Sequence, residues 1–140
     1  MPDGTTRALI ALCRLRRVRT DSARRDLAQA VARERAVVER EAGLTRAMDD
    51  ARRIDDGFDR EVYSRWFARM IAERQRMGEM RAEAAALTAA ERAELARRRV
   101  AETAAEDAVA RRMAEAELIT ARRDQATLEE IARAIRLAGE

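Results

Sequence analysis

One turn signal interrupts a chain that has no proline after its second residue. Pro2 is the single proline, and Asp55, Asp56 and Gly57 stand between two long runs rich in Arg, Glu and Ala. Asp tolerates turn conformations and Gly reaches positive φ without a clash, so this triplet can reverse the chain. Asp59 is suited to cap the next helix, because its carboxylate can accept from free N–H groups of the first turn. The sequence therefore predicts two long helices that reverse direction near Gly57.

The composition favours a narrow fold over an ordinary globule. Charged residues make up 39% of the chain and aromatic residues only 3%. Because few large apolar side chains are present, a wide core cannot be filled, whereas paired helices need only a narrow apolar stripe. We expect one all-α domain, residues 1–140, folded as a long antiparallel two-helix coiled-coil hairpin shaped like a thin rod.

The expected helices are of unequal length. We predict a first helix over about residues 7–54 with Thr5 or Thr6 as its N-cap, a turn at about 55–59, and a second helix over about 60–138. At 1.5 Å per residue the helices are roughly 70 and 120 Å long. A turn at Gly57 pairs residue i with about residue 115 − i, so the second helix overhangs the first from about residue 110. An alternative turn at residues 77–79 is less favoured, because no Asn, Asp or Pro neighbours Gly78.

The apolar pattern predicts an irregular seam between the helices. Leu9, Leu12, Leu15 and Val18 recur at spacings of three, which implies a shift of the heptad frame before Ala23, as at a stutter. Beyond that point one frame has apolar residues at one core position and acidic residues at the other. The apolar positions are Ala30, Val37, Leu44, Ala51 and Phe58, and the acidic ones include Glu34, Glu41 and Asp55.

Several classes of function lack the residues that they need. The chain has no His and a single cysteine, Cys13, so neither a disulfide within the chain nor a Cys/His metal site can form. It has no Gly-rich phosphate loop, and its carboxylates alternate with Arg at helical spacing, where no cleft can raise their pKa values. We expect no enzymatic activity and no cofactor.

No segment is long and apolar enough to serve as a membrane anchor. The apolar run from Ala8 to Cys13 is far shorter than the roughly 20 residues that cross a bilayer. It also lacks the length and cleavage site of a secretory signal. We therefore expect a cytoplasmic protein without membrane insertion.

The net positive charge is concentrated near the N-terminus. All 29 basic residues are Arg, and against 26 acidic residues they leave a net charge of +3. One hypothesis is that the N-terminal cluster binds nucleic acid or an anionic surface by neutralising phosphates. No aromatic residues are interleaved for base stacking, however, so a solvated face that pairs across the hairpin is favoured. The cluster is Arg14, Arg16, Arg17, Arg19, Arg24 and Arg25, and its expected partners are Glu91, Glu94, Glu102, Glu106 and Asp107.

Three of the four aromatic residues follow the expected turn. Tyr63, Trp66 and Phe67 share one side of the second helix with Met70, and some must face Leu44, Met48 or Ala51 across the hairpin. A two-helix interior is too narrow to bury all three rings. Exposed aromatic residues are favoured as interface anchors, so two hypotheses stand side by side: the cluster binds a partner, or it only packs within the hairpin.

Four features together resemble the type III export stalk proteins of the FliJ/YscO family, found in bacterial flagella and injectisomes. They are the length of 140 residues, the opening stretch with Leu9, Leu12, Leu15 and Arg16, the aromatic patch after the turn, and the C-terminal run from Asp124 to Arg136. The first helix departs from flagellar members in being poor in glutamine and aromatic residues. The resemblance therefore does not distinguish a flagellar from an injectisome system.

The resemblance implies a non-enzymatic central stalk or adaptor at the cytoplasmic side of a membrane-embedded export apparatus. Members of the family form an antiparallel two-helix coiled coil whose terminal end enters a hexameric export ATPase. They also contact the membrane export gate and bind export chaperones, and no specific nucleic acid is implied. Carried over to this chain, the ATPase-binding residues would be Leu9, Leu12, Leu128, Ile131 and Ile135, and the export-gate-binding residues Leu44, Met48, Tyr63, Trp66 and Met70. The alternatives are the Arg-rich binder of nucleic acid or anionic surfaces and a homodimeric coiled-coil scaffold.

Overall fold

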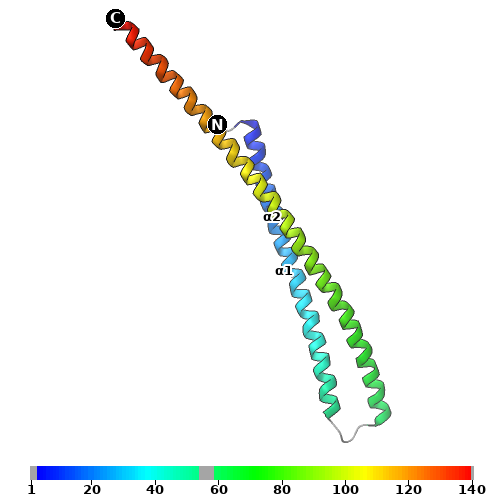
Figure 1. The fold of residues 1–140 in the computed structure, drawn as a ribbon. Helices are drawn as coiled ribbons and strands as arrows, with labels where there is room; N and C mark the ends of the chain where they lie inside the picture. Colours follow the sequence, from blue (N-terminus) through cyan, green and yellow to red (C-terminus); the bar gives the residue numbers. More distant parts are fainter. Residues whose placement is uncertain (1–2, 54–58, 140) are drawn as a thin grey trace. The chain divides into compact units, whose positions relative to one another are not determined.

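The protein is a hairpin of two long helices. The computed structural model describes residues 3–53 and 59–139. Helix α1 spans Gly4–Arg53 and helix α2 spans Arg60–Ala138. The two helices pack against each other and run in opposite directions (Figure 1). The all-α two-helix hairpin predicted from the sequence is thereby confirmed, whereas the predicted turn residues Asp55, Asp56 and Gly57 lie outside the described residues.

Aspartates cap the N-termini of both helices. Asp59 accepts a hydrogen bond from the N–H of Glu61 at 3.0 Å, which confirms the cap predicted for α2. At α1 the prediction of Thr5 or Thr6 was wrong. Asp3 is the cap, and its carboxylate accepts from the N–H of Thr6 at 2.7 Å. The helix therefore begins at Gly4, because an acceptor three residues before Thr6 satisfies a first-turn donor that would otherwise be free.

One heptad pattern runs through α1 without a shift. The buried and half-buried positions alternate in steps of three and four from the first turn of the helix to the last. The expected stutter before Ala23 is therefore absent, and Leu15 and Val18 are 45% and 60% exposed. Residues spaced by three, such as Leu15 and Val18, move steadily around the helix and do not stay on one side of it. The side of α1 that packs against α2 instead includes polar residues. Its two rows are Leu9, Arg16, Ala23, Ala30, Val37, Leu44 and Ala51, and Thr6, Cys13, Thr20, Leu27, Glu34, Glu41 and Met48.

The seam is closed mostly by small side chains. Ala23, Ala30 and Ala105 are buried, as are Thr20 and Thr88, while the large buried side chains are Met48, Met77 and Leu95. The Thr88 hydroxyl donates to the carbonyl of Ala84 at 3.0 Å, so its polar atom is satisfied inside the helix. Small seam residues allow helix axes to approach closely, which offsets the scarcity of large apolar side chains.

Helix α2 continues through Gly78 without interruption. It spans Arg60–Ala138, so the alternative turn at residues 77–79 does not occur. A Cβ atom built at Gly78 would meet no atom within 4 Å, and one at Gly43 would meet only Arg46 Nη2 at 3.9 Å. Neither glycine is therefore required by its position in the helix.

The chain divides into two compact units, to each of which both helices contribute. Residues 20–98 form one unit, in which Arg81 and Glu41 are joined across the helices by an ion pair at 3.0 Å. Residues 1–19 and 99–140 form the other. There Arg112 pairs with Asp3 at 2.9 Å, and Arg17 pairs with acidic residues of α2. The predicted pairing of residue i with residue 115 − i gives the Asp3–Arg112 pair. The observed partners of Arg17 and Glu41 lie one to two helical turns closer to the C-terminus than this rule predicts.

Candidate interaction surfaces

The C-terminal part of α2 exposes an apolar stripe. Leu128, Ile131 and Ile135 are 66%, 50% and 67% exposed, and their spacing of three and four places them on one side of the helix. This segment extends past the N-terminal end of α1 (Figure 1). Since Arg112 is the residue of α2 that pairs with the α1 cap Asp3, Leu128 lies roughly 24 Å beyond that pairing at 1.5 Å per residue. Because α1 begins at Gly4, helix α1 does not extend far enough along α2 to cover Leu128.

The stripe does not continue the seam between the helices. At roughly 100° per residue, Leu128, Ile131 and Ile135 lie about 100–160° around the helix from Arg112, which is half-buried and faces α1. A partner that covers the stripe would therefore contact α2 on a different side from α1. The surface is available without separation of the hairpin.

The five residues assigned to ATPase binding fall into two groups. Leu9 and Leu12 are half-buried residues of α1, whereas the three stripe residues lie on the exposed end of α2. Because the α1 cap Asp3 lies beside Arg112, Leu9 and Leu12 lie alongside the preceding part of α2. The structure does not bring these leucines together with the stripe into one surface.

Three aromatic rings form a contiguous cluster at the start of α2. The ring centroids of Tyr63 and Phe67 are 5.8 Å apart with planes 23° from parallel, and Trp66 lies 6.2 Å from Tyr63 and 6.4 Å from Phe67. These separations are those of favourable aromatic pairs. Helix α1 contributes Arg52, whose guanidinium carbon is 5.0 Å from the Phe67 ring centroid, a cation–π distance. All three rings are half-buried, so each presents part of its surface to solvent.

The other residues assigned to the export gate differ in exposure. Leu44 and Met70 are half-buried and have surface within reach of a partner. Met48, in contrast, is 1% exposed and belongs to the core. Met48 must therefore be removed from the set of candidate contact residues, because its side chain fills the interior between the helices.

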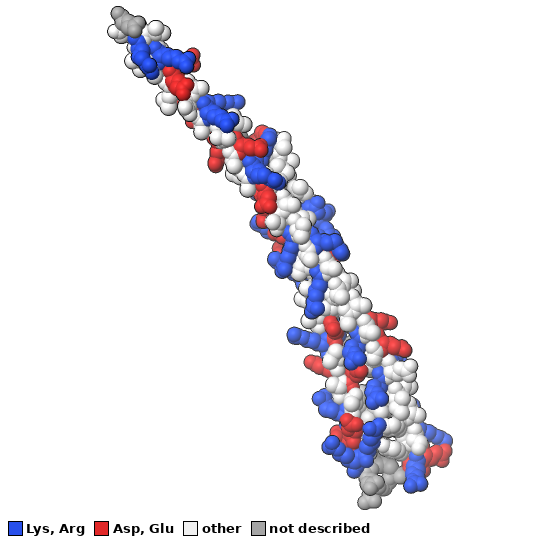
Figure 2. All heavy atoms as spheres, in the orientation of Figure 1, with Lys and Arg blue, Asp and Glu red and all other residues white. Residues whose placement is uncertain are grey.

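The N-terminal Arg cluster pairs only in part with the opposing helix. Arg17 donates to Glu106 at 3.1 Å and lies 3.7 Å from Glu102. Glu106 is the main reason that the pKa of Arg17 is raised above its usual value. Arg24 instead pairs with Asp21 of its own helix at 3.0 Å. Figure 2 shows acidic side chains interspersed among the basic ones on the visible face, an arrangement that weakens any single-sign field.

In the described part of the chain, three of the five expected acidic partners do not pair with the Arg cluster. Glu94 binds Arg97 at 2.6 Å and Arg98 at 2.7 Å on its own helix, and these hydrogen bonds lower its pKa. For Glu91 and Asp107 no ion pair is present among residues 3–53 and 59–139. Exposed pairs of this kind contribute little to stability, so they are weak determinants of the helix register.

The interpretation of the sequence missed the surface beside the α1 N-terminus. Ile10, Met113 and Ile119 line an open groove there together with residues of both helices. Met113 and Ile119 are 51% and 50% exposed. Ile119 is seven residues after Arg112 and so occupies the next position of the α2 seam row. That heptad spacing is the signal that could have identified it, had the end of α1 been placed correctly.

Neither a metal site nor a membrane span is found in the described part of the chain. Residues 3–53 and 59–139 contain no group of three or more His, Cys, Asp or Glu side chains that could hold a metal ion. None of the helices among these residues is long and apolar enough to cross a membrane.

Comparison of the chain with protein-family models, with curated proteins and with solved structures found no match.

Proposed function

We propose that this protein is a non-enzymatic stalk or adaptor of a type III protein export apparatus, which couples a hexameric export ATPase to the membrane export gate. Its C-terminal helical segment would bind the ATPase, and the aromatic cluster would bind the gate. The protein would then act at the cytoplasmic face of the membrane, with export chaperones as further partners.

The exposed stripe of Leu128, Ile131 and Ile135 is the observation that carries the proposal. Full burial of one such side chain contributes roughly 1.5–3 kcal/mol, and each is half to two-thirds exposed, so covering all three would contribute about 3–5 kcal/mol before the losses of association. A group of large apolar side chains exposed together on one side of a helix is typical of a binding surface. A partner that encloses the helix end would use them.

The aromatic cluster supports a second contact. Tyr63 and Trp66 are amphipathic rings that lie together on a helix, and anchors of this kind dominate binding energy in protein interfaces. Arg52 of α1 makes a cation–π contact with Phe67, so one ring of the cluster already has a partner across the hairpin in the free protein. Preorganised anchors lose less entropy on binding than mobile ones.

The test is stimulation of a cognate export ATPase by the purified protein. The double variant Leu128→Asp/Ile131→Asp should abolish stimulation, because two buried carboxylates without partners oppose the complex strongly. A matched control places the same two charges on exposed apolar residues of the paired region, Val18→Asp/Val100→Asp, which are 60% and 71% exposed in the wild type. The control should stimulate as the wild type does.

Circular dichroism separates a binding defect from a folding defect. Both double variants should keep the helicity of the wild type, since all four positions are exposed. If the stripe variant unfolds, the stripe is part of a core. If it is folded and still stimulates the ATPase fully, the stripe does not bind that partner and the proposal fails.

A further inference from the structure

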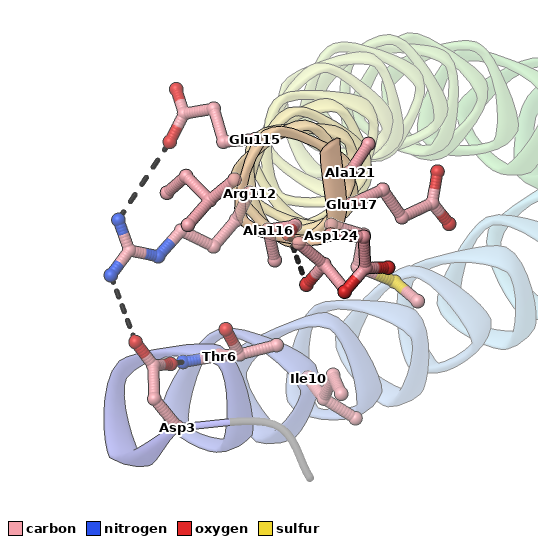
Figure 3. A pocket seen from close by; sticks show the side chains of 12 residues that line it. Asp3, Thr6, Ile10, Arg112, Glu115, Ala116, Glu117, Ala121 and Asp124 are labelled. Carbon is pink, nitrogen blue, oxygen red and sulfur yellow. Dashed lines mark hydrogen bonds and ion pairs between the residues drawn. The ribbon is translucent and has the colours of Figure 1, made fainter. Parts of the chain in front are cut away.

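An open groove lies where α1 begins beside α2. Its volume is about 710 Å³, and it is lined by residues of the first two turns of α1 and of the stretch of α2 from Arg112 to Asp124. The floor includes the apolar side chains of Ile10, Met113 and Ile119. Because α1 begins at Gly4 while α2 continues, the α2 face that would pack against a longer α1 is left without a covering helix here (Figure 3).

The rim of the groove is acidic. Four carboxylates line it, those of Asp3, Glu115, Glu117 and Asp124, against the single guanidinium of Arg112. Arg112 is already engaged by two of them, with Asp3 at 2.9 Å and Glu115 at 3.7 Å. In Figure 3 these three residues lie on one side of the groove and Glu117 extends on the other.

The remaining two carboxylates carry uncompensated charge. Neither Glu117 nor Asp124 forms an ion pair or hydrogen bond with any of the residues 3–53 and 59–139. A nearby guanidinium or ammonium group of a ligand would gain charge-assisted hydrogen bonds from them, and Arg could do so with both oxygens of one carboxylate. Anionic lipid or nucleic acid would instead be repelled.

We propose that this groove binds a short amphipathic segment of another protein, whose apolar side chains contact Ile10, Met113 and Ile119 and whose Arg or Lys side chains pair with Glu117 and Asp124. A chain segment fits better than a small molecule, because the groove is open along the helix and continues the line on which α1 packs. The lining of the groove does not include Leu128, Ile131 or Ile135, although Asp124 lies one turn before Leu128 on the same side of α2. The inference rests on the groove residues alone and does not require the export assignment.

The experiment is an unbiased selection of peptides by the full-length protein. A phage-displayed library of random 12-residue peptides is selected against the wild type, and enriched peptides are synthesised with a fluorescent label. Their dissociation constants are measured by fluorescence anisotropy. We expect enriched peptides that combine Leu or Ile with Arg or Lys at helical spacing, and binding that weakens as salt is raised.

Charge-neutral variants locate the site. Glu117→Gln/Asp124→Asn should weaken binding of the enriched peptides at least tenfold, and Ile119→Ser should do the same by removing part of the apolar floor. Glu83→Gln/Asp50→Asn is the matched control, because it removes two exposed carboxylates elsewhere and should leave the affinity unchanged. All these positions are exposed, so circular dichroism should show wild-type helicity.

Three results would overturn the proposal. The first is the absence of enriched peptides, or enrichment of acidic ones. The second is equal affinity of the enriched peptides for the wild type and for Glu117→Gln/Asp124→Asn. The third is concentration-dependent dimerisation of the wild type that this double variant abolishes, since the occupant would then be a second copy of the chain.

Discussion

Replacement of Gly78 by alanine should stabilise the protein. Glycine in a helix interior is about 0.8–1.0 kcal/mol less favourable than alanine. The main reason is that glycine gives the unfolded chain more conformational entropy, which is lost on folding. The gain is realised only where a methyl group fits. At Gly78 a Cβ atom would meet nothing within 4 Å, and the residue is in the interior of α2, several turns from either end. The full difference should therefore appear as stability.

The expected magnitude is measurable. We predict that Gly78→Ala raises the free energy of unfolding by about 0.5–1 kcal/mol. Unfolding entropy is about 2.1 cal/mol/K per residue, so for a chain of 140 residues the melting temperature should rise by about 2–3 °C. Urea titration followed by circular dichroism gives the free energy, and a thermal scan gives the temperature.

Gly43 and Ala82 supply matched comparisons. Gly43→Ala should stabilise by a similar amount, because its Cβ would make only an ordinary contact with Arg46. Ala82→Gly, at an exposed position of the same helix, should destabilise by about 1 kcal/mol. Loss of stability in Gly78→Ala would refute the reasoning, since α2 would then have to bend at Gly78.

Three further predictions concern the core, the α1 cap and the aromatic cluster. Met48→Ala should destabilise by about 2–5 kcal/mol in urea titration, because it empties a core position that is 1% exposed, and a smaller loss would contradict its burial. The hydrogen bonds from Thr6 and then that from Arg112 lower the pKa of Asp3 to about 2 from 3.8, so its stabilising contribution should be complete above pH 4 and be lost as the pH falls toward 2. Asp3→Asn should remove that part of the acid sensitivity, and an unchanged acid titration would speak against the cap. Trp66→Ala should weaken binding to the export gate more than tenfold while lowering the melting temperature less than Met48→Ala does, and the opposite ranking would place Trp66 in the core.

The helical hairpin could be predicted from local chemistry because nothing in the chain competes with it. Long runs of Arg, Glu and Ala favour helix at nearly every position, and proline is absent after Pro2. The Asp59 cap was predictable for the same reason, since an N-cap needs only an acceptor within its own turn. The cap of α1 was misassigned because Asp3, Thr5 and Thr6 are all good cap residues, and the backbone N–H of Thr6 turned out to be a donor to Asp3.

The choice of inward-facing residues depended on the tertiary structure. Hydrophobicity alone placed Leu15 and Val18 in the seam and left Arg16 outside, whereas the structure does the reverse. The reason is that a helix that packs along its length against one partner must keep the same side toward it, whatever residues fall there. Long charged side chains can meet this demand by burying their stems and keeping their charged ends in water.

Of the surfaces available for binding, one could be predicted from the sequence and one depended on the tertiary structure. Leu128, Ile131 and Ile135 could be recognised as exposed from the difference in helix lengths, a property of the sequence. The groove floored by Ile10, Met113 and Ile119 could not, because its position depends on where α1 begins and which turn of α2 lies beside it. Local chemistry therefore determined the two helices and the uncovered helix end, whereas packing between residues far apart in the chain decided the seam, the burial of Met48 and the acidic groove.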